Sequence, residues 1–319
     1  MQRHNRRAFL QTSAGALALS FTAKAKSSGE WTLPSSEQTA PALPTDKGKK
    51  PLRLGLILGT GKDADAAIAK VRDLGLPTCQ LFADDFDSAS ALRLRQALDK
   101  YSIEATSLVV GGPGPEVYDF YRGPVTIGLV PFETRSPRIA HIKKASDFAK
   151  HCGIPAVQTH CGFIPEDPNE PRYIEIVAAI RDVASYCKNN NQYFRCETGQ
   201  ETPITLVRVI RDIDLDNVGV NFDLANLILY GKANPVDAIE ILAPYIQGIH
   251  AKDGLWPTNP KDLGEEVPIG RGKVDFPRII ARLKEIRYSG AVTIEREISG
   301  PQQLADVRAS IEFLRKLIG

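Results

Sequence analysis

The feature of this sequence that most constrains its fold is a regular alternation of short apolar runs with helix-length amphipathic stretches. The eight expected strands are residues 52–59, 78–83, 104–110, 156–162, 193–198, 218–223, 246–252 and 291–297. The expected helices between and after them are residues 63–74, 89–101, 137–152, 172–189, 203–212, 235–242, 276–286 and 301–318. A helix-length segment separates every two successive strands, and this alternation predicts a parallel sheet.

Two further observations favour a closed barrel over a doubly wound open sheet. Residues 51–319 are close in length to the ~250 residues of a typical eight-stranded α/β barrel. The turn after the first strand, LGTGKDAD, has too few glycines at the spacing that a dinucleotide-binding sheet requires. We therefore expect residues 51–319 to form a single α/β domain, a (β/α)8 TIM barrel.

The N-terminal residues differ from the rest of the chain. Adjacent arginines, Arg6 and Arg7, precede a modestly apolar run over residues 14–23 that ends in small residues suited to cleavage. This pattern resembles a twin-arginine signal peptide over residues 1–25, which predicts the Tat export machinery as a partner and a periplasmic or secreted location. The alternative is a basic N-terminus that stays on a cytosolic protein.

Composition argues against two classes of partner. The apolar run is shorter than the ~20 residues that span a bilayer, so no stable membrane anchor is expected. Residues 26–50 are rich in Ser, Pro, Thr and Lys, which suits a flexible linker. The whole chain has 40 Lys plus Arg against 38 Asp plus Glu, a formal charge of +2 that gives no basis for nucleic-acid binding.

Ionisable side chains end four successive strands in the C-terminal half. They are Glu197, Asp223, His250 and Glu295. The carboxyl ends of barrel strands meet at one mouth, so these side chains should converge there. Each carboxylate alone is explained by a helix cap or a salt bridge, but burying several unpaired charges together is costly. A shared divalent ion would offset that cost, and three carboxylates with one imidazole suit Mn²⁺ first, with Mg²⁺, Co²⁺ or Zn²⁺ as alternatives.

The motifs around these residues carry a more specific signal. Taken in order, CETGQET, NFDLAN, IHAKDG, VPIGRGKVDF and VTIERE resemble the sugar phosphate isomerase/epimerase family of the xylose isomerase-like barrels. The resemblance extends from Leu52 to the C-terminus. It implies one divalent metal ion held by the Glu, Asp, His and Glu of strands five to eight, and a small carbohydrate substrate. The implied metal ligands are Glu197, Asp223, His250 and Glu295.

Three further residues are expected to contact the substrate. Asn226 stands where ketose epimerases have a histidine, and its amide can bond a hydroxyl but cannot take up a proton. His160 ends the fourth strand, where it faces the substrate or caps the barrel. Lys252 shares a strand face with His250, so it either holds a negative oxygen or pairs with Asp253 or Asp223.

Several segments near these residues are open to two interpretations. The connection over residues 111–136 is long and contains four aromatic residues, so it either binds the sugar or packs onto its own barrel. Glu201 and Glu297 lack the support that the four ligand candidates give each other. We expect them to be groups behind the ligands or at the surface.

The residues suggest a reaction by proton transfer next to a carbonyl. In this hypothesis Glu197 and Glu295 are the catalytic base and acid, and the substrate passes through a metal-stabilised enediolate. Return of the proton gives epimerisation or isomerisation, whereas loss of a leaving group would make the enzyme a 3-keto-glycoside lyase. Export favours a non-phosphorylated sugar, inosose or keto-sugar. A non-catalytic carbohydrate-binding barrel is the alternative of another class, and the sequence leaves homo-oligomer formation open.

Overall fold

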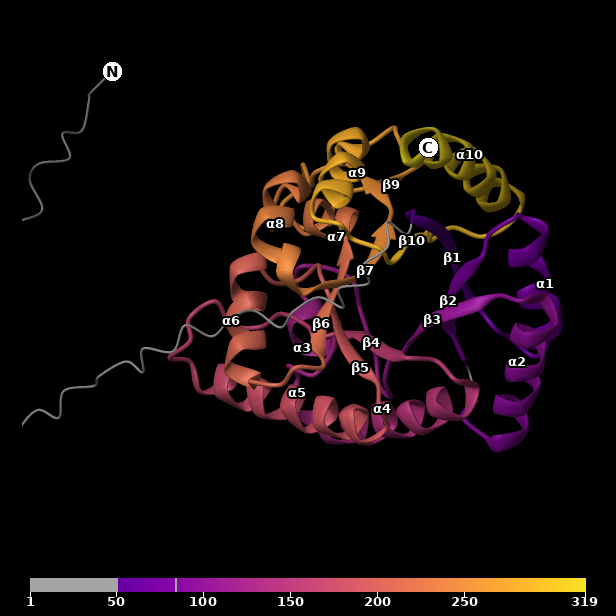
Figure 1. Cartoon of the computed structure of the whole chain (residues 1–319). Coiled ribbons are helices and arrows are strands. Elements are labelled where there is room, and N and C mark those ends of the chain that lie inside the picture. The colour runs from indigo at the N-terminus through magenta and orange to yellow at the C-terminus, as the bar shows by residue number, and fades with distance from the viewer. Residues whose placement is uncertain (1–50, 84) are drawn as a thin grey trace, which may run out of the picture. The chain divides into compact units, whose positions relative to one another are not determined.

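The fold is that of a computed structural model, which describes residues 51–83 and 85–319. The expected TIM barrel is confirmed, because eight parallel strands close in the order β1-β10-β7-β6-β5-β4-β3-β2 and helices surround them (Figure 1). The signal peptide expected at residues 1–25 and the linker expected at 26–50 lie outside the described residues. No helix in the described part combines the length and apolarity that crossing a bilayer requires.

The observed elements agree with the sequence-based ones to within a few residues at most ends. The barrel strands are β1 (Arg53–Gly59), β2 (Thr78–Phe82), β3 (Glu104–Val109), β4 (Ala156–His160), β5 (Tyr193–Glu197), β6 (Val218–Asp223), β7 (Ile246–Ala251) and β10 (Ala291–Ile294). The expected helices are α1 (Ala64–Asp73), α2 (Ser88–Tyr101), α4 (Phe132–Cys152), α5 (Pro171–Asn189), α6 (Pro203–Ile213), α8 (Pro235–Leu242), α9 (Phe276–Glu285) and α10 (Pro301–Ile318). Side-chain caps such as Asp63 at α1 and Asp275 at α9 define their starts.

Some short elements were not expected from the sequence. They are α3 (Gly123–Thr126), α7 (Leu224–Leu229), the 3₁₀ turn η1 (Ala243–Tyr245), and the strands β8 (Asp253–Gly254) and β9 (Glu266–Val267). The expectation that a helix separates every two strands is wrong at β8, which follows β7 directly and pairs with β9 in a separate antiparallel ladder. Two-residue strands carry no periodic pattern, so the sequence holds no signal for them.

The start of α4 also differs from expectation. A proline is favoured in the first turn of a helix, which is why the sequence predicts a start at Pro137. The helix instead begins at Phe132 and includes Pro137 in its interior. The preceding turn is held by Arg135, which donates to the carbonyls of Leu129 and Val130 at 2.8 Å each.

Strand register brings the ligand candidates to one level of the barrel. Asp223 of β6 lies opposite His250 of β7, and Glu197 of β5 lies opposite His160 of β4. The register between β6 and β7 shifts by one residue after Val220. A β-bulge of this kind re-aims the side chains that follow it, so it contributes to the position of His250.

The segment between β3 and α4 is organised by one buried arginine. Arg138 of α4 is 1% exposed. Its guanidinium donates hydrogen bonds to four backbone carbonyls of this segment, those of Pro113 (3.2 Å), Pro115 (3.0 Å), Thr126 (2.7 Å) and Gly128 (2.6 Å). Hydrogen bonds from a charged donor are stronger than neutral ones. Residues 111–131 are therefore an anchored wall of the barrel mouth.

We expect Arg138→Met to loosen this wall, because methionine fills much of the same volume but donates no hydrogen bond. Leaving the four carbonyls without their donor should lower the free energy of unfolding by about 2–4 kcal/mol. Urea unfolding measures the stability, and amide hydrogen exchange over residues 111–131 measures the wall itself. The control is Arg93→Met, at an exposed position of α2. Unchanged exchange protection in Arg138→Met would contradict the anchoring role.

Candidate metal centre

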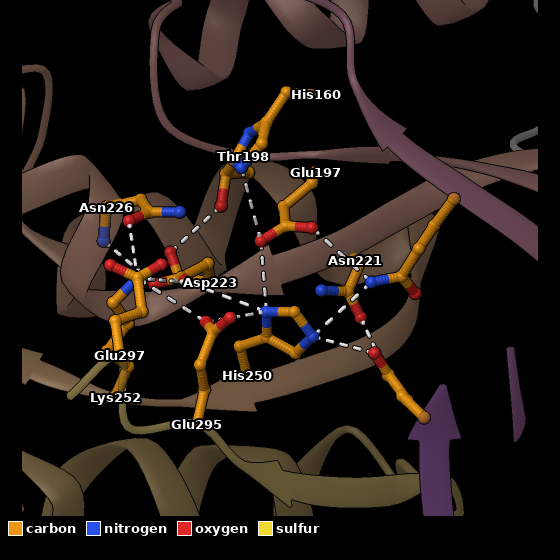
Figure 2. Close-up of polar contacts among 12 residues, drawn as sticks. His160, Glu197, Thr198, Asn221, Asp223, Asn226, His250, Lys252, Glu295 and Glu297 are labelled. Atoms are coloured by element: carbon orange, nitrogen blue, oxygen red, sulfur yellow. Dashed lines mark hydrogen bonds and ion pairs between the residues drawn. The ribbon is translucent and has the colours of Figure 1, made fainter. Parts of the chain in front are cut away.

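The four predicted ligands lie together at the carboxyl end of the barrel. Glu197 and Asp223 end β5 and β6, His250 lies in β7, and Glu295 directly follows β10. One ligand atom from each lies within 4.8 Å of the others, and all four residues are buried. Figure 2 shows the three carboxylates pointing toward the His250 ring. The arrangement is a cluster that could bind a metal ion.

The atoms facing the centre of this cluster lie within ion-pair distance of each other but lack hydrogen bonds. His250 Nδ1 lies 3.0 Å from Glu197 Oε1, 3.1 Å from Glu295 Oε2 and 3.6 Å from Asp223 Oδ2. His250 Nδ1, Asp223 Oδ2 and Glu295 Oε2 are nevertheless buried without a hydrogen-bond partner among the described residues. Buried polar atoms are normally satisfied. One imidazole nitrogen and several carboxylate oxygens converging in this way fit a divalent ion.

Residues behind the ligands fix their orientation. Gln80 Oε1 lies 2.7 Å from His250 Nε2. Gln158 Nε2 lies farther from the same nitrogen, at 3.3 Å. The shorter contact, to an oxygen that can only accept, favours a hydrogen on Nε2, and Nδ1 is the nitrogen that faces the carboxylates. On the other side Ser107 donates to Gln158 Oε1 at 2.6 Å, and Gln158 Nε2 lies 3.4 Å from Glu197 Oε2. Such outer contacts are typical of metal sites.

Asp223 has two roles, one for each of its oxygens. Its Oδ1 accepts a hydrogen bond from the backbone N–H of Asn226 at 2.8 Å and so caps α7. Its Oδ2 is the atom that faces His250. A helix cap and a metal ligand are therefore not alternatives here, because one carboxylate serves both.

Lys252 is a buried cation beside the cluster. Its Nζ lies 2.7 Å from Glu297 Oε1, 3.4 Å from Glu295 Oε2 and 3.7 Å from Asp223 Oδ2, and it donates to Asn226 Oδ1 at 3.2 Å. Burial alone would lower its pKa, but these carboxylates raise the pKa well above its usual value, so the ammonium stays charged. Of the two pairings left open for Lys252, the structure shows the one with Asp223. The carboxylate of Asp253 instead accepts from four backbone N–H groups of residues 254, 270, 272 and 274.

Opposing effects set the protonation of the metal-free cluster. Burial acts to lower the pKa of His250, yet the charges of Glu197 and Glu295 raise it well above its ordinary value. For Glu295, burial acts to raise the pKa, but Lys252 and His250 together hold it well below the usual range. Burial raises the pKa of Asp223 to about 6. The imidazole is therefore protonated without metal, and an incoming cation would displace that proton.

A cavity of about 440 Å³ opens above the cluster. Glu197 and Glu295 line it, as do His160 and Asn226, two of the residues expected to contact substrate. Lys252, the third, does not line the cavity but lies behind Asn226. The sequence did not identify Phe82, Glu116 and Tyr230, which also line it. No sequence motif includes these three residues, although Glu116 belongs to the long connection over residues 111–136.

Glu201 and Glu297, which were expected behind the ligands or at the surface, have different environments. Glu297 pairs with Lys252 and lines the cavity, so it belongs to the site. Glu201 is 1% exposed, both of its oxygens lack a hydrogen-bond partner among the described residues, and it does not line the cavity. Burial raises the pKa of Glu201 to about 8. It is therefore a neutral, buried acid at pH 7 rather than a surface group.

Comparisons with known proteins identify the same fold. A family model described as "Xylose isomerase-like TIM barrel" matches residues 68–317. The crystal structure of a xylose isomerase domain protein from Planctomyces limnophilus is 36% identical, covers 84% of this chain and 97% of its own, and superposes with a TM-score of 0.79. The protein MJ1311 of Methanocaldococcus jannaschii is 28% identical over 70% of this chain and 73% of its own length.

A more distant structure shares the fold. It is a D-psicose 3-epimerase from Clostridium cellulolyticum H10, solved with D-tagatose, with 16% identity, 84% coverage of this chain, 99% of its own and a TM-score of 0.63.

We expect Gln80→Met to weaken divalent-metal binding by about 10- to 100-fold, because His250 then loses the acceptor that orients its ring. Isothermal titration of the metal-free protein with Mn²⁺ measures the change. Gln96→Met, at an exposed position of α2, is the matched control and should bind like the original protein. Equal affinity in both variants would show that Gln80 does not hold the ligand.

We expect Glu201→Gln to change the pH dependence of stability. The pKa of about 8 in the folded protein exceeds the ~4.3 of an exposed glutamate, so Glu201 contributes stability that is present below pH 4.3 and lost as pH rises through 8. The amide does not ionise. Between pH 5 and pH 9 the free energy of unfolding of the original protein should therefore fall by a few kcal/mol relative to that of Glu201→Gln, as thermal unfolding at the two pH values measures. Glu312→Gln, at an exposed position of α10, should show no such gain, and a parallel pH profile for Glu201→Gln would refute the buried acid.

Proposed function

We propose that this chain, which belongs to the xylose isomerase-like TIM barrel family, is a divalent-metal-dependent sugar isomerase or epimerase. It would transfer a proton next to the carbonyl of a non-phosphorylated sugar, inosose or keto-sugar. One observation carries the proposal. Of the four clustered residues, Glu197 and Glu295 line the cavity, whereas Asp223 and His250 are 0% exposed and do not. Two carboxylates are thus available to a substrate, as proton exchange requires.

The two glutamates are placed to work as a base and an acid. Both have an oxygen within 3.1 Å of His250 Nδ1, so they approach the same point from different strands. One carboxylate takes the proton from the carbon beside the carbonyl, and the electron pair of that C–H bond moves onto the carbonyl oxygen to give an enediolate. The other carboxyl returns a proton. A divalent ion bound at this cluster would supply Lewis-acid polarisation of the carbonyl.

Neighbouring groups support the same assignment. Lys252 holds Glu295 at 3.4 Å and Gln158 holds Glu197 at 3.4 Å, so each carboxylate is oriented before substrate arrives. His160 Nε2 lies 3.7 Å from Glu197 Oε1 at the cavity wall, where it can bond a substrate hydroxyl. The amide of Asn226, in α7, also lines the cavity and can do the same, but it cannot exchange a proton.

The charges of the cavity favour a substrate without phosphate. No lysine or arginine is among the residues that line it, in the part of the chain that the structure describes. Lys252 lies behind the wall and is already paired with Glu297. Phosphate sites in proteins are normally built from cations or helix N-termini. The twin-arginine pattern supports the same class, because phosphorylated sugars are intracellular metabolites.

The donor set also supports a choice of ion. Three carboxylates and one imidazole form a mostly oxygen site, for which Mn²⁺ is the proposed ion, and Mg²⁺, Co²⁺ and Zn²⁺ are the alternatives. The D-psicose 3-epimerase shares the barrel with this chain, which supports a sugar as the substrate.

We expect Glu197→Gln and Glu295→Gln each to lower proton exchange by about 10²- to 10⁴-fold, because an amide cannot take up or return the proton. The measurement is deuterium incorporation from D₂O, followed by NMR, with the Mn²⁺-loaded protein and a panel of ketoses, aldoses, inososes and 3-keto-glycosides. Glu133→Gln, at an exposed position of α4, is the control. Metal content is measured in every variant, so that loss of the ion is separated from loss of the base.

The products of the same experiment distinguish the related reactions. Deuterium at the inverted carbon indicates an epimerase, deuterium at the neighbouring carbon indicates an isomerase, and release of an aglycone indicates a lyase. Fructose 6-phosphate should exchange far more slowly than fructose. Full exchange by both glutamine variants with metal bound would refute the proposed acid and base, and binding of sugars without any exchange would indicate a carbohydrate-binding barrel.

A further inference from the structure

We propose that the cavity binds an uncharged carbohydrate of two rings, with the reacting ring at the two glutamates and the second ring against Tyr118 and Phe82. This inference rests on the proposed function, because Glu197 and Glu295 define the position of the reacting ring. It adds a second subsite at the part of the barrel mouth lined by Phe82 and Tyr118.

The size of the cavity is the first observation. Its volume is about 440 Å³. A hexose occupies on the order of 200 Å³ at the packing density of ~0.75 found in protein interiors. A single ring at the metal centre would thus leave about half of the cavity to water. The remaining space has the size of a second ring.

The walls of the cavity divide into two chemical zones. Around the metal centre they are polar, with Glu197, Glu295 and His160. Phe82 at the end of β2 and Tyr118, whose ring contacts His160, supply aromatic surface to the same cavity. Because His160 ends β4, the two aromatic residues reach this cavity beside different strands. A pyranose ring has an apolar face, which can stack on an aromatic side chain, and a polar edge, which can bond the polar groups of the wall.

The exposure of these two aromatic rings is the second observation. Phe82 is 41% exposed and Tyr118 is 49% exposed, although both line a cavity. The Tyr118 ring meets His160 in an edge-type contact with centroids 5.8 Å apart, which leaves the rest of its surface uncovered. When a ligand covers aromatic surface that is exposed at a cavity wall, the removal of that surface from water stabilises the complex.

The wall that carries Tyr118 is anchored, so the second zone stays open. The four carbonyl contacts of Arg138 hold residues 113–128 in place. Leu129 also donates to the carbonyl of Cys161 at 2.9 Å, which ties the segment to the end of β4. A wall held this way does not need to close over a small substrate, and a preformed subsite binds without the cost of ordering.

The charged groups of the cavity wall favour a neutral second ring. Glu116 and Glu297 line the cavity and present carboxylate oxygens that accept hydrogen bonds from sugar hydroxyls. Glu297 is already paired with Lys252, and Glu116 lies 3.8 Å from Arg138. No lysine or arginine of the described residues lines the cavity to pair with a carboxylate or phosphate on a second ring. The chemistry of the subsite therefore selects a glycosyl unit with free hydroxyls.

The test compares ketoses with and without a second ring. Isothermal titration of the full chain loaded with Mn²⁺ uses fructose as the single ring, and maltulose, lactulose, isomaltulose and turanose as its glycosylated forms. We expect at least one disaccharide to bind about tenfold more tightly than fructose. Tyr118→Ala and Phe82→Ala should each lower the ratio of disaccharide to fructose affinity by roughly fivefold, the effect of losing one aromatic contact.

The matched control is Tyr121→Ala, since Tyr121 is an exposed tyrosine of the same segment that does not line the cavity. It should keep the original ratio. Because Phe82 lies on a different element, a loss in both variants cannot be assigned to disruption of one loop. Equal affinity for fructose and every disaccharide, or no disaccharide binding at all, overturns the second subsite. Deuterium exchange into fructose is measured separately, so failure of the proposed function is recognised independently.

Discussion

The approach of three buried carboxylates to one imidazole nitrogen is the constraint on which the rest of this site depends. Carboxylates brought together away from water repel each other and lose their hydration, and the cost is several kcal/mol for each unpaired charge. A divalent ion would remove both penalties. The surrounding groups match this requirement, because Gln80 and Gln158 orient the ligands and Lys252 adds one positive charge behind them.

Acidic residues near the cluster also hold the backbone in place through hydrogen bonds. Asp223 caps α7 with one oxygen and faces His250 with the other, so the first turn of the helix and the centre of the site are built together. Asp253 uses its carboxylate to gather four backbone N–H groups, and thereby folds the segment after β8 back onto the mouth. Lys252, between His250 and Asp253 in sequence, is left to neutralise the acids of the site.

The cavity wall is held together by a different kind of interaction from the metal centre. The centre is determined by charge, whereas the wall over residues 111–131 is determined by backbone hydrogen bonding to one buried guanidinium. Arg138 satisfies carbonyls that would otherwise be buried without donors, and it does so from a helix that follows the wall in sequence. The metal centre and the cavity wall are therefore held in place by different interactions.

The sequence by itself determined the barrel and the four clustered residues. Strand and helix periodicities are local features of the sequence. Because the carboxyl ends of the parallel strands meet at one mouth of a barrel, the sequence was enough to predict that Glu197, Asp223, His250 and Glu295 lie close together. The roles of these residues in catalysis stay predictions. Tertiary structure alone decided which partners the remaining polar groups take. Arg138 bonds carbonyls 10 to 25 residues away. Lys252 lies closest to Glu297 among the acids around it. Of the two positions left open for Glu201, the structure shows the buried one. Periodicity predicts which face of an element is covered, but the partner of a charged side chain depends on distances across the fold that the sequence does not contain.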